Sequence, residues 1–246
     1  METYSVLGVK CSSLTMEEAL QILEGFLSEE RPHLVVTVGP EMVMRAQENE
    51  EFKALVNGAD LVVPDGAGIL WAGRQCGIKF PERVAGVELI VRFAQRLGRL
   101  QAPLFLLGAA PGIAEKAGEN LQKQIDNLPL AGVNDGYFQD PQPIVEKIAA
   151  SQAKVLYVGL GSPAQERWVR QHGAAAGIRV GIGVGGSFDV LSGAKKRAPR
   201  WMIQLHLEWL YRFLCEPSRF GRILAIPKFM LRVMRAGSQA VKPWNE

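Results

Sequence analysis

The sequence predicts an α/β fold in which helices cover both faces of a mostly parallel sheet. Its second half alternates short apolar runs, glycine turns and helical segments, the pattern of parallel strands joined by crossover helices. With 246 residues and 48% hydrophobic content, the chain is long enough to bury a large core. Residues 195–246 hold eleven Lys or Arg and three Glu, a balance of +8, whereas residues 1–194 sum to −5. We therefore predict a core over 1–194 and a basic helical appendage over 195–246.

Strand and helix patterns follow in order along the first half. The segment Thr15-Met-Glu-Glu18 is typical of a capping box that starts a helix. Pro40 suits a first helical turn, where its missing N–H removes no hydrogen bond. The expected elements are an edge strand over 4–9, a helix from the capping box to about 27, a strand over 34–38, a helix over 40–46, a strand over 61–63 and helices over about 68–75 and 87–97.

Three strands that end in glycine turns are expected in the second half, over residues 104–107, 155–158 and 179–184. Such turns offer backbone N–H groups to an anion, but any α/β fold also uses them as tight connections. Gly181-Ile-Gly-Val-Gly-Gly186 matches the letters of the dinucleotide fingerprint, although no further strand and acidic residue follow at the usual spacing. We interpret it as a turn that approaches a phosphate or ribose, with an NAD-dependent oxidoreductase as the minor alternative.

The stretch 60–68 is the most informative, because an apolar run stops at Pro64 and is followed by Asp65, Gly66 and Gly68. A strand over 61–63 would place Asp65 at a carboxyl end, where open α/β sheets bind their ligands. The glycines would let backbone approach a ligand closely. The alternative is an ordinary Asp-Gly turn with a solvated carboxylate.

Several kinds of site have no signature in the sequence. It contains no Walker motif, no Asp-x-Asp pair and no nucleophile elbow, and its three histidines are isolated, so we predict no metal and no other cofactor. Cys11, Cys76 and Cys215 are widely spaced, as expected for free thiols in a reducing cytoplasm. Neither a signal peptide nor an apolar run near the ~20 residues of a membrane span is expected.

The appendage mixes aromatic, apolar and basic residues. Residues 201–214 are expected to form an aromatic-rich helix, and 219–235 a second segment in which basic residues alternate with large apolar ones. Such segments lie on membrane surfaces or against partners. The alternative is a final helix pair packed on the sheet with a solvated basic face, and Pro227 argues against one continuous helix. The charge predicts an anionic partner, either phosphates or anionic lipid.

Without a metal, a diphosphate would have to be stabilised by cations and backbone dipoles. Planar guanidinium groups suit bidentate contacts to such a group. The candidate cations are Arg83, in a glycine-flanked loop, and Arg197, Arg212, Arg219 and Arg222 in the appendage.

Ordered motifs extend along nearly the whole chain. They are Thr37, Pro-Asp-Gly at 64–66, Glu-Arg-Val-Ala-Gly at 82–86, Leu-Leu-Gly-x-x-Pro-Gly at 106–112, Asp-Gly-Tyr-Phe at 135–138, Gly-Leu-Gly-Ser-Pro-x-Gln-Glu at 159–166, Val-Gly-Gly-x-Phe-Asp at 184–189, Arg-Ala-Pro at 197–199 and Glu-Trp-Leu-Tyr-Arg at 208–212. Taken together, they resemble the WecG/TagA/CpsF glycosyltransferases, and most closely the TagA branch of that family.

The resemblance implies a Rossmann-like core and a metal-independent, inverting transfer of N-acetylmannosamine from UDP-N-acetylmannosamine. The implied acceptor is undecaprenyl-diphosphate-linked N-acetylglucosamine, joined by a β-1,4 linkage in the linkage unit of wall teichoic acid. It further implies a protein attached peripherally to the inner face of the cell membrane, with an appendage that helps to close the site. We expect no nucleic-acid partner, and a homo-oligomer is a conjecture.

The resemblance also assigns roles to four polar residues. An inverting transfer needs a base that takes the acceptor hydroxyl proton, and Asp65 is the candidate, with a helix cap as its alternative. Thr37 and Gln165 would hydrogen-bond sugar or acceptor, although Gln165 could equally be a helix-start residue. Arg83 would stabilise the diphosphate, against the alternative of a surface ion pair with Glu82 or a neighbour.

The nucleotide would be held by a second set of residues. Tyr137 offers an aromatic face for uracil, or is instead a partly buried core aromatic, and Asp189 offers a carboxylate for ribose hydroxyls. The remaining substrate-binding candidates are Gly108, Gly136, Gly161 and Gly186, together with Arg212, Arg219 and Arg222 of the appendage.

One residue departs from the family pattern. Gly39 stands where the family usually has Asn, so an amide that would orient a substrate hydroxyl is missing. A relative that uses another UDP-sugar, N-acetylmannosaminuronic acid or glucose, is therefore an alternative. A non-catalytic scaffold on the membrane surface is another, and it would turn over no UDP-sugar.

Overall fold

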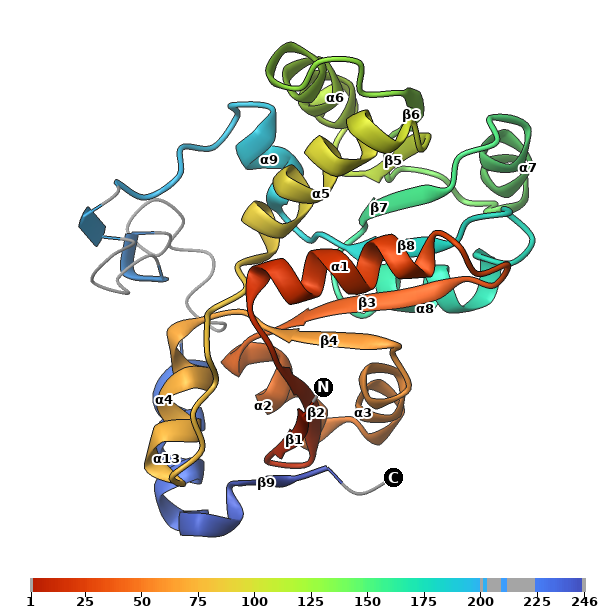
Figure 1. Cartoon of the computed structure of the whole chain (residues 1–246). Coiled ribbons are helices and arrows are strands. Elements are labelled where there is room, and N and C mark those ends of the chain that lie inside the picture. Colours follow the sequence, from red (N-terminus) through yellow and green to blue (C-terminus); the bar gives the residue numbers. More distant parts are fainter. Residues whose placement is uncertain (1, 200, 203–208, 212–223, 245–246) are drawn as a thin grey trace.

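A parallel sheet of six strands forms the centre of this computed structural model, which describes residues 2–199, 201–202, 209–211 and 224–244 (Figure 1). The strand order is β4-β3-β8-β7-β5-β6, and every neighbouring pair is parallel. The strands are β3 (His33–Val38), β4 (Leu61–Pro64), β5 (Leu104–Gly108), β6 (Leu130–Asn134), β7 (Val155–Gly159) and β8 (Val180–Gly183). The predicted α/β fold is confirmed.

Helices cover both faces of this sheet. One face packs against α1 (Met16–Phe26), α5 (Gly86–Leu100), α6 (Ile113–Gln124) and α9 (Ser187–Leu191). The other packs against α2 (Pro40–Glu48), α3 (Glu50–Asn57), α7 (Gln142–Ala150) and α8 (Ala164–His172). Successive strand residues point to opposite faces, so in β3 Leu34 and Val36 enter one core and Val35 the other. Strands buried on both faces explain the continuous apolar runs in the sequence.

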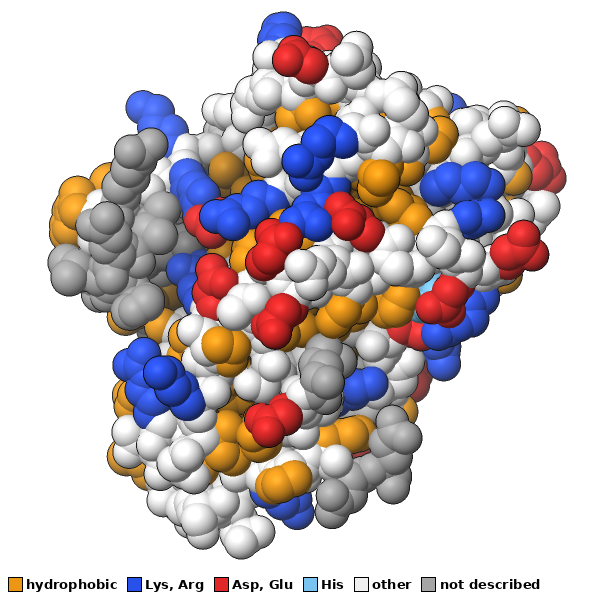
Figure 2. Space-filling model, in the orientation of Figure 1, with side chains coloured by type: hydrophobic (Ala, Val, Ile, Leu, Met, Phe, Trp, Pro, Cys, Tyr) orange, Lys and Arg blue, Asp and Glu red, His pale blue; other side chains and the backbone are white. Residues whose placement is uncertain are grey.

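Apolar packing, rather than surface charge, holds α1 against α5. Acidic and basic side chains intermingle over these two helices on the face shown in Figure 2. Among them, Arg96 of α5 pairs with Glu17 at 2.5 Å and with Glu24 at 2.9 Å. Ion pairs at the solvent boundary contribute little to stability. The two helices instead share a buried apolar core, to which Leu20 and Phe93 belong.

The N-terminal segment forms a hairpin, so the expected single edge strand over 4–9 is wrong. Its strands, β1 (Glu2–Val6) and β2 (Val9–Ser13), are antiparallel and belong to a separate three-stranded sheet, in the order β2-β1-β9. Leu7 and Gly8 make the turn with φ values of 49° and 84°. Positive φ at both central residues fits the twist of a two-residue hairpin, and Gly8 was the signal for it.

The C-terminal described segment returns to the start of the chain. It comprises α13 (Ala225–Ala236), the 3₁₀ helix η2 (Gly237–Gln239) and β9 (Val241–Pro243), which pairs antiparallel with β1. Helix α13 packs on α2 and on α4 (Ala67–Gln75), with Phe229 and Val233 fully buried (Figure 1). Pro227 lies in the first turn of α13, where proline is tolerated.

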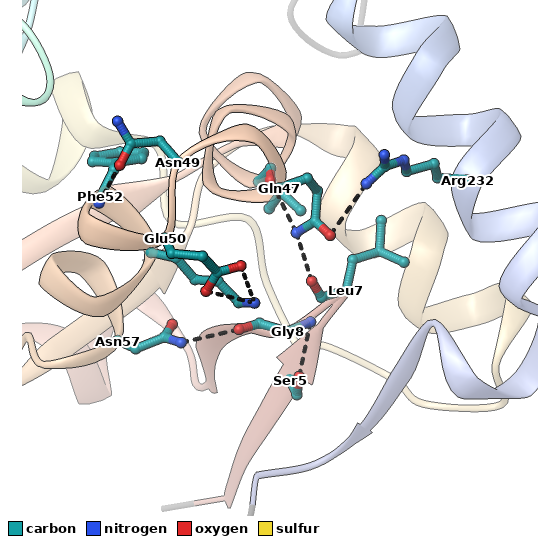
Figure 3. Close-up of polar contacts among 11 residues, drawn as sticks. Ser5, Leu7, Gly8, Gln47, Asn49, Glu50, Phe52, Asn57 and Arg232 are labelled. Atoms are coloured by element: carbon teal, nitrogen blue, oxygen red, sulfur yellow. Dashed lines mark hydrogen bonds and ion pairs between the residues drawn. The ribbon is translucent and has the colours of Figure 1, made fainter.

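A glutamine links the hairpin, α2 and α13. In Figure 3, Gln47 Nε2 donates to the Leu7 carbonyl at 2.7 Å, and Arg232 of α13 donates to Gln47 Oε1 at 3.3 Å. Asn57 Nδ2 donates to the Gly8 carbonyl at 3.0 Å. The hairpin turn is therefore fastened to helices on both sides of it.

Besides the hairpin and the elements after α13, the structure contains α3, β6 and α7, which had not been expected from the sequence. Helix α3 begins after one residue, Asn49, whose side chain accepts from the Phe52 N–H at 2.8 Å. An Asn cap followed by two glutamates is a helix-start signal that the sequence did contain. Strand β6 lies at the sheet edge and is only half-buried, so it lacks the strong apolar signal of the inner strands.

Candidate active site

A cavity of about 1020 Å³ lies at the carboxyl ends of the parallel strands. Its lining includes the ends of β3 and β4 and the turns after β5, β6, β7 and β8. Of the residues predicted for the site, those that line this cavity are Thr37, Asp65, Arg83, Gly136, Tyr137, Gly161, Gln165, Gly186 and Asp189. The fold therefore brings together residues spread over more than half of the chain, as the strand-end argument requires.

Asp65 stands directly after β4. Its N–H donates to the Val38 carbonyl at 2.8 Å, which continues the pairing with β3. Its carboxylate accepts from the Gly86 N–H through Oδ2 at 3.0 Å and approaches Arg83 Nε through Oδ1 at 3.4 Å. The alternative of a cap for the next helix is wrong, because Gly66 caps α4 without a side-chain bond. The Asp65 carboxylate is instead fixed by the start of α5.

Gly86 is a site residue that the sequence analysis missed. A Cβ atom there would lie 3.1 Å from Thr37 Oγ1 and 3.4 Å from Asp65 Oδ2. Only glycine lets the first turn of α5 approach both side chains this closely. The start of α5 also presents the Gly86 N–H to the Asp65 carboxylate, and the N-terminus of a helix favours negative charge nearby. The signal was a glycine at the start of a strongly amphipathic helix.

Arg83 faces the cavity and not its sequence neighbour. The Val84 N–H donates to the Pro64 carbonyl at 2.9 Å, which lays this segment beside the end of β4. Glu82 turns away and accepts from the Met16 N–H at 2.8 Å, where it caps α1. The alternative of an ion pair between Arg83 and Glu82 is therefore wrong, and Arg83 pairs with Asp65.

Gln165 is buried beneath the turn that follows β8. Its Oε1 accepts from the Gly185 N–H at 3.0 Å, and its Nε2 donates to Glu166 Oε1 at 2.8 Å. A Cβ on Gly183 would lie 2.5 Å from that Nε2, so glycine is required there. Gln165 thus positions the cavity-lining turn at 183–186 as well as facing the cavity.

Glu166 is a buried carboxyl whose pKa is raised, chiefly because burial disfavours its charged form. The unfolded chain ionises near the ordinary value of 4.5, whereas the folded protein holds the proton to higher pH. Above the unfolded-state pKa, the unfolded chain has lost this proton while the folded protein still keeps it. The free energy of unfolding therefore falls as pH rises, until the raised folded-state pKa is passed.

Replacing this carboxyl with an amide should remove that pH dependence. We expect Glu166→Gln to gain stability relative to the wild type between about pH 5 and pH 8. The amide oxygen still accepts from Gln165, so the network is kept. Urea unfolding of both proteins at the two pH values measures the difference, and a constant difference would show that Glu166 titrates normally.

Tyr137 is 76% exposed, so the alternative of a partly buried core aromatic is wrong. Its N–H donates to Asp135 Oδ1 at 2.8 Å, and the Gly136 N–H donates to the Ala109 carbonyl at 2.9 Å. These bonds fix the turn on which the ring stands. An exposed aromatic ring at a cavity rim offers a face for a planar ligand.

Asp189 and Gly108 have protein partners of their own. Asp189 Oδ2 pairs with Lys195 Nζ at 2.8 Å, so a ribose would meet a carboxylate that is already held by a cation. Gly108 is absent from the cavity lining among the described residues, and a Cβ on it would lie 2.5 Å from the Gly159 carbonyl carbon. Its glycine is thus explained by close backbone packing between β5 and β7.

The glycines after β4 serve packing as well. A Cβ on Gly68 would lie 2.5 Å from Pro40 Cγ, and one on Gly66 would lie 3.4 Å from Pro40 Cδ. At Gly68 the close approach seen is the contact of α4 with α2, and both Gly66 and Gly68 also line the cavity. Gly161, by contrast, has φ +78° and open space around its Cα, so its backbone is accessible from the cavity.

Gly181, the first of the fingerprint-like glycines, lies within β8 and has a packing role. A Cβ on Gly181 would lie 2.5 Å from Val169 Cγ1, so glycine lets α8 pack against β8. Among the described residues, the five-residue α9 follows the turn after β8 directly, and no later strand joins the parallel sheet. This topology lacks the crossover that a dinucleotide site uses.

The cavity contains two further features that the sequence analysis missed. Arg45 of α2 lines it and donates through Nη1 to the Ser162 carbonyl at 2.5 Å. An apolar wall lines its other side, formed by Trp71 of α4, Trp209, and Ile226 and Met230 of α13. No local sequence pattern marks Arg45 or the apolar wall, because their places in the cavity depend on which helices meet at the end of the sheet.

Some predicted residues lie outside the described part of the chain, namely Arg212, Arg219, Arg222, Cys215 and most of the expected helix over 201–214. Arg197 is described, and it pairs with Glu88 of α5. Cys11 and Cys76 are free thiols, as predicted. No cluster of potential metal ligands occurs among the described residues, and none of their helices is long and apolar enough to cross a membrane.

Comparison with known proteins gives the family. The profile of the glycosyl transferase WecG/TagA/CpsF family matches residues 4–242. The chain belongs to this family. The resemblance drawn from the motifs is thereby confirmed, and the family match extends from the N-terminal hairpin to β9.

Three relatives, described below, share the name N-acetylglucosaminyldiphosphoundecaprenol N-acetyl-beta-D-mannosaminyltransferase. The protein of Bacillus spizizenii is 34% identical over 218 residues, which are 89% of this chain and 85% of the relative. That of Bacillus subtilis is 30% identical over 236 residues, 96% and 92% of the two chains. That of Staphylococcus aureus is 32% identical over 234 residues, 94% and 92%.

Proposed function

We propose that this chain transfers N-acetylmannosamine from UDP-N-acetylmannosamine to N-acetylglucosamine on a polyprenyl diphosphate, in synthesis of the wall teichoic acid linkage unit. The proposal is supported by the name that three relatives share over at least 85% of their length. The observation that carries it is the Asp65 carboxylate, fixed by Gly86 and Arg83 in a cavity large enough for a sugar nucleotide and an acceptor.

The proposed reaction is a single inverting displacement. The acceptor hydroxyl oxygen attacks the anomeric carbon of the donor while Asp65 takes its proton. The bond from that carbon to the diphosphate oxygen breaks on the opposite side, and UDP leaves with the electron pair. Inversion of an α-linked donor gives the β-1,4 product.

Cations would stabilise charge that develops on the departing diphosphate. Arg83 and Arg45 line the described part of the cavity, and Arg83 is poised beside the base. Arg212, Arg219 and Arg222 of the appendage are proposed to add to them. With this supply of positive charge the transfer would need no metal ion.

The donor sugar depends on the space beside Gly39. Gly39 lines the cavity as the residue before α2, and a Cβ there would lie 3.0 Å from the Asp65 carbonyl oxygen. A side chain such as the usual Asn would have to fit against that backbone. Its absence leaves room near the base, and N-acetylmannosaminuronic acid or glucose are the competing donor sugars.

A donor comparison tests this function. UDP release is measured with the lipid-diphosphate-GlcNAc acceptor and EDTA, using the UDP derivatives of N-acetylmannosamine, N-acetylmannosaminuronic acid and glucose. We expect release with the first donor to exceed the others by at least about tenfold, since one pocket contact is worth about 1–3 kcal/mol. Activity that stops in EDTA would refute the metal-free mechanism, and preference for another sugar would reassign the donor.

The appendage is proposed to hold the enzyme at the inner membrane surface. Support comes from α13, which carries Lys228, Arg232 and Arg235 together with exposed Leu231 and Met234. Basic residues beside exposed apolar ones suit an anionic lipid surface. A homo-oligomer stays a prediction, which light scattering with and without vesicles tests.

A further inference from the structure

The cavity has two chemically different sides. Thr37, Asp65 and Arg83 lie on the polar side, whereas the apolar wall faces the same space from α4 and α13. In a sugar nucleotide only the uracil suits an aromatic surface, and Tyr137 already offers it one, while the sugars and diphosphate are polar. The wall therefore suits a ligand that carries a long apolar group next to its reacting sugar.

The apolar wall continues out of the cavity along α13. Ile226, Met230 and Met234 follow one another at intervals of four residues, so they lie along one side of the helix. Exposure increases outward, from half-buried Ile226 to 37% for Met230 and 60% for Met234. This row is a track from the cavity to the surface.

The charged residues of α13 leave this track uninterrupted. At about 100° per residue, Lys228, Arg232 and Arg235 project well away from the line of Ile226, Met230 and Met234. Phe229 and Val233 project toward the core and are fully buried. Methionine side chains are flexible and polarisable, so they adapt to an apolar ligand of irregular shape.

We propose that the apolar wall and Met234 bind the first isoprene units of the acceptor's polyprenyl chain. This rests on the proposed function, which supplies a lipid-linked acceptor. The sugar would lie at Asp65 and the diphosphate near the cavity arginines, and the lipid would leave along α13. Specificity for a lipid acceptor would then be a property of the site itself, separate from attachment to a membrane.

Acceptors of different tail length test this inference in solution, without vesicles or detergent. N-acetylglucosamine diphosphate is used with a methyl group, one isoprene unit or three isoprene units. For the full-length wild type, we expect the acceptor KM to fall as the tail lengthens. Met230→Gln should raise the KM of the three-unit acceptor about fivefold, because a buried CH₂ group contributes about 0.8 kcal/mol.

Two readouts separate this role from a structural one. The KM of the methyl acceptor and that of the UDP-sugar should stay unchanged in Met230→Gln. Leu231→Gln is the matched control, since Leu231 is 44% exposed on the same helix but does not line the cavity. It should leave all KM values unchanged.

The opposite results would overturn the inference. A wild-type KM that is independent of tail length, or equal effects of Met230→Gln and Leu231→Gln, would assign α13 to general surface adhesion. Failure of the proposed function looks different, because the wild type would then transfer sugar to none of the three acceptors, and the inference would fall with it.

Discussion

Asp65→Asn is expected to lower the rate of sugar transfer by about a thousandfold, within the range typical for loss of a general base. The asparagine oxygen can still accept from the Gly86 N–H, so the turn keeps its geometry, but the amide cannot take a proton. UDP release under saturating substrates measures the loss. Binding of UDP, followed by calorimetry, should change little, because Asp65 acts on the acceptor hydroxyl.

Asp60→Asn is the matched control for this experiment. Asp60 precedes the same strand at its other end, where it pairs with Arg31 at 2.6 Å and accepts from the Leu34 N–H at 2.9 Å. The substitution is identical, and the carboxylate is likewise ion-paired, but it lies at the end of the sheet away from the cavity. If the Asp65→Asn variant transferred sugar as fast as the Asp60→Asn variant, Asp65 would not be the base.

Phe229→Ala is expected to lower the free energy of unfolding by about 3–5 kcal/mol, the usual cost of removing a large buried aromatic side chain. Phe229 is fully buried where α13 packs on the core. Urea unfolding measures the change in the free energy of unfolding. Hydrogen exchange of the α13 amides shows whether α13 opens locally while the rest stays folded. If it does, the destabilisation can be no larger than the free energy of that local opening.

Met234→Ala is the control for that change, because Met234 is exposed on the same helix. Its substitution should change the unfolding free energy by less than about 0.5 kcal/mol. Equal values for the two variants would mean that α13 does not pack on the core in solution. That result would also weaken any site role for the apolar wall.

The inner strands and Asp65 were predictable from local patterns. Apolar runs buried on both faces identify strands, and Pro64 ends β4 just before Asp65. The hairpin was missed because a single apolar run hides a turn at Leu7 and Gly8. Strand β9 has three residues and forms only because β1 offers it an edge.

The rest of the site depends on contacts between distant segments. Gly68 carried a correct signal for close approach, and the segment that approaches it is the distant Pro40. Glu82 and Arg83 are neighbours in sequence and serve different helices and sites. The order of strands in the sheet decides which residues share a cavity. No short stretch of the sequence shows that order.

The pairing of β9 with β1 has a consequence for the order of folding. Val6 and Val241 are partners, so this contact closes almost the longest loop that the described chain allows. Loop closure of this kind is entropically unfavourable, and during synthesis β1 emerges long before its partner. The parallel sheet can form first, with β1 paired to β2 alone among the described strands. Arrival of β9 then fixes α13 beside α2 and α4, so that a nascent chain completes the apolar wall of its cavity only as the last described residues leave the ribosome.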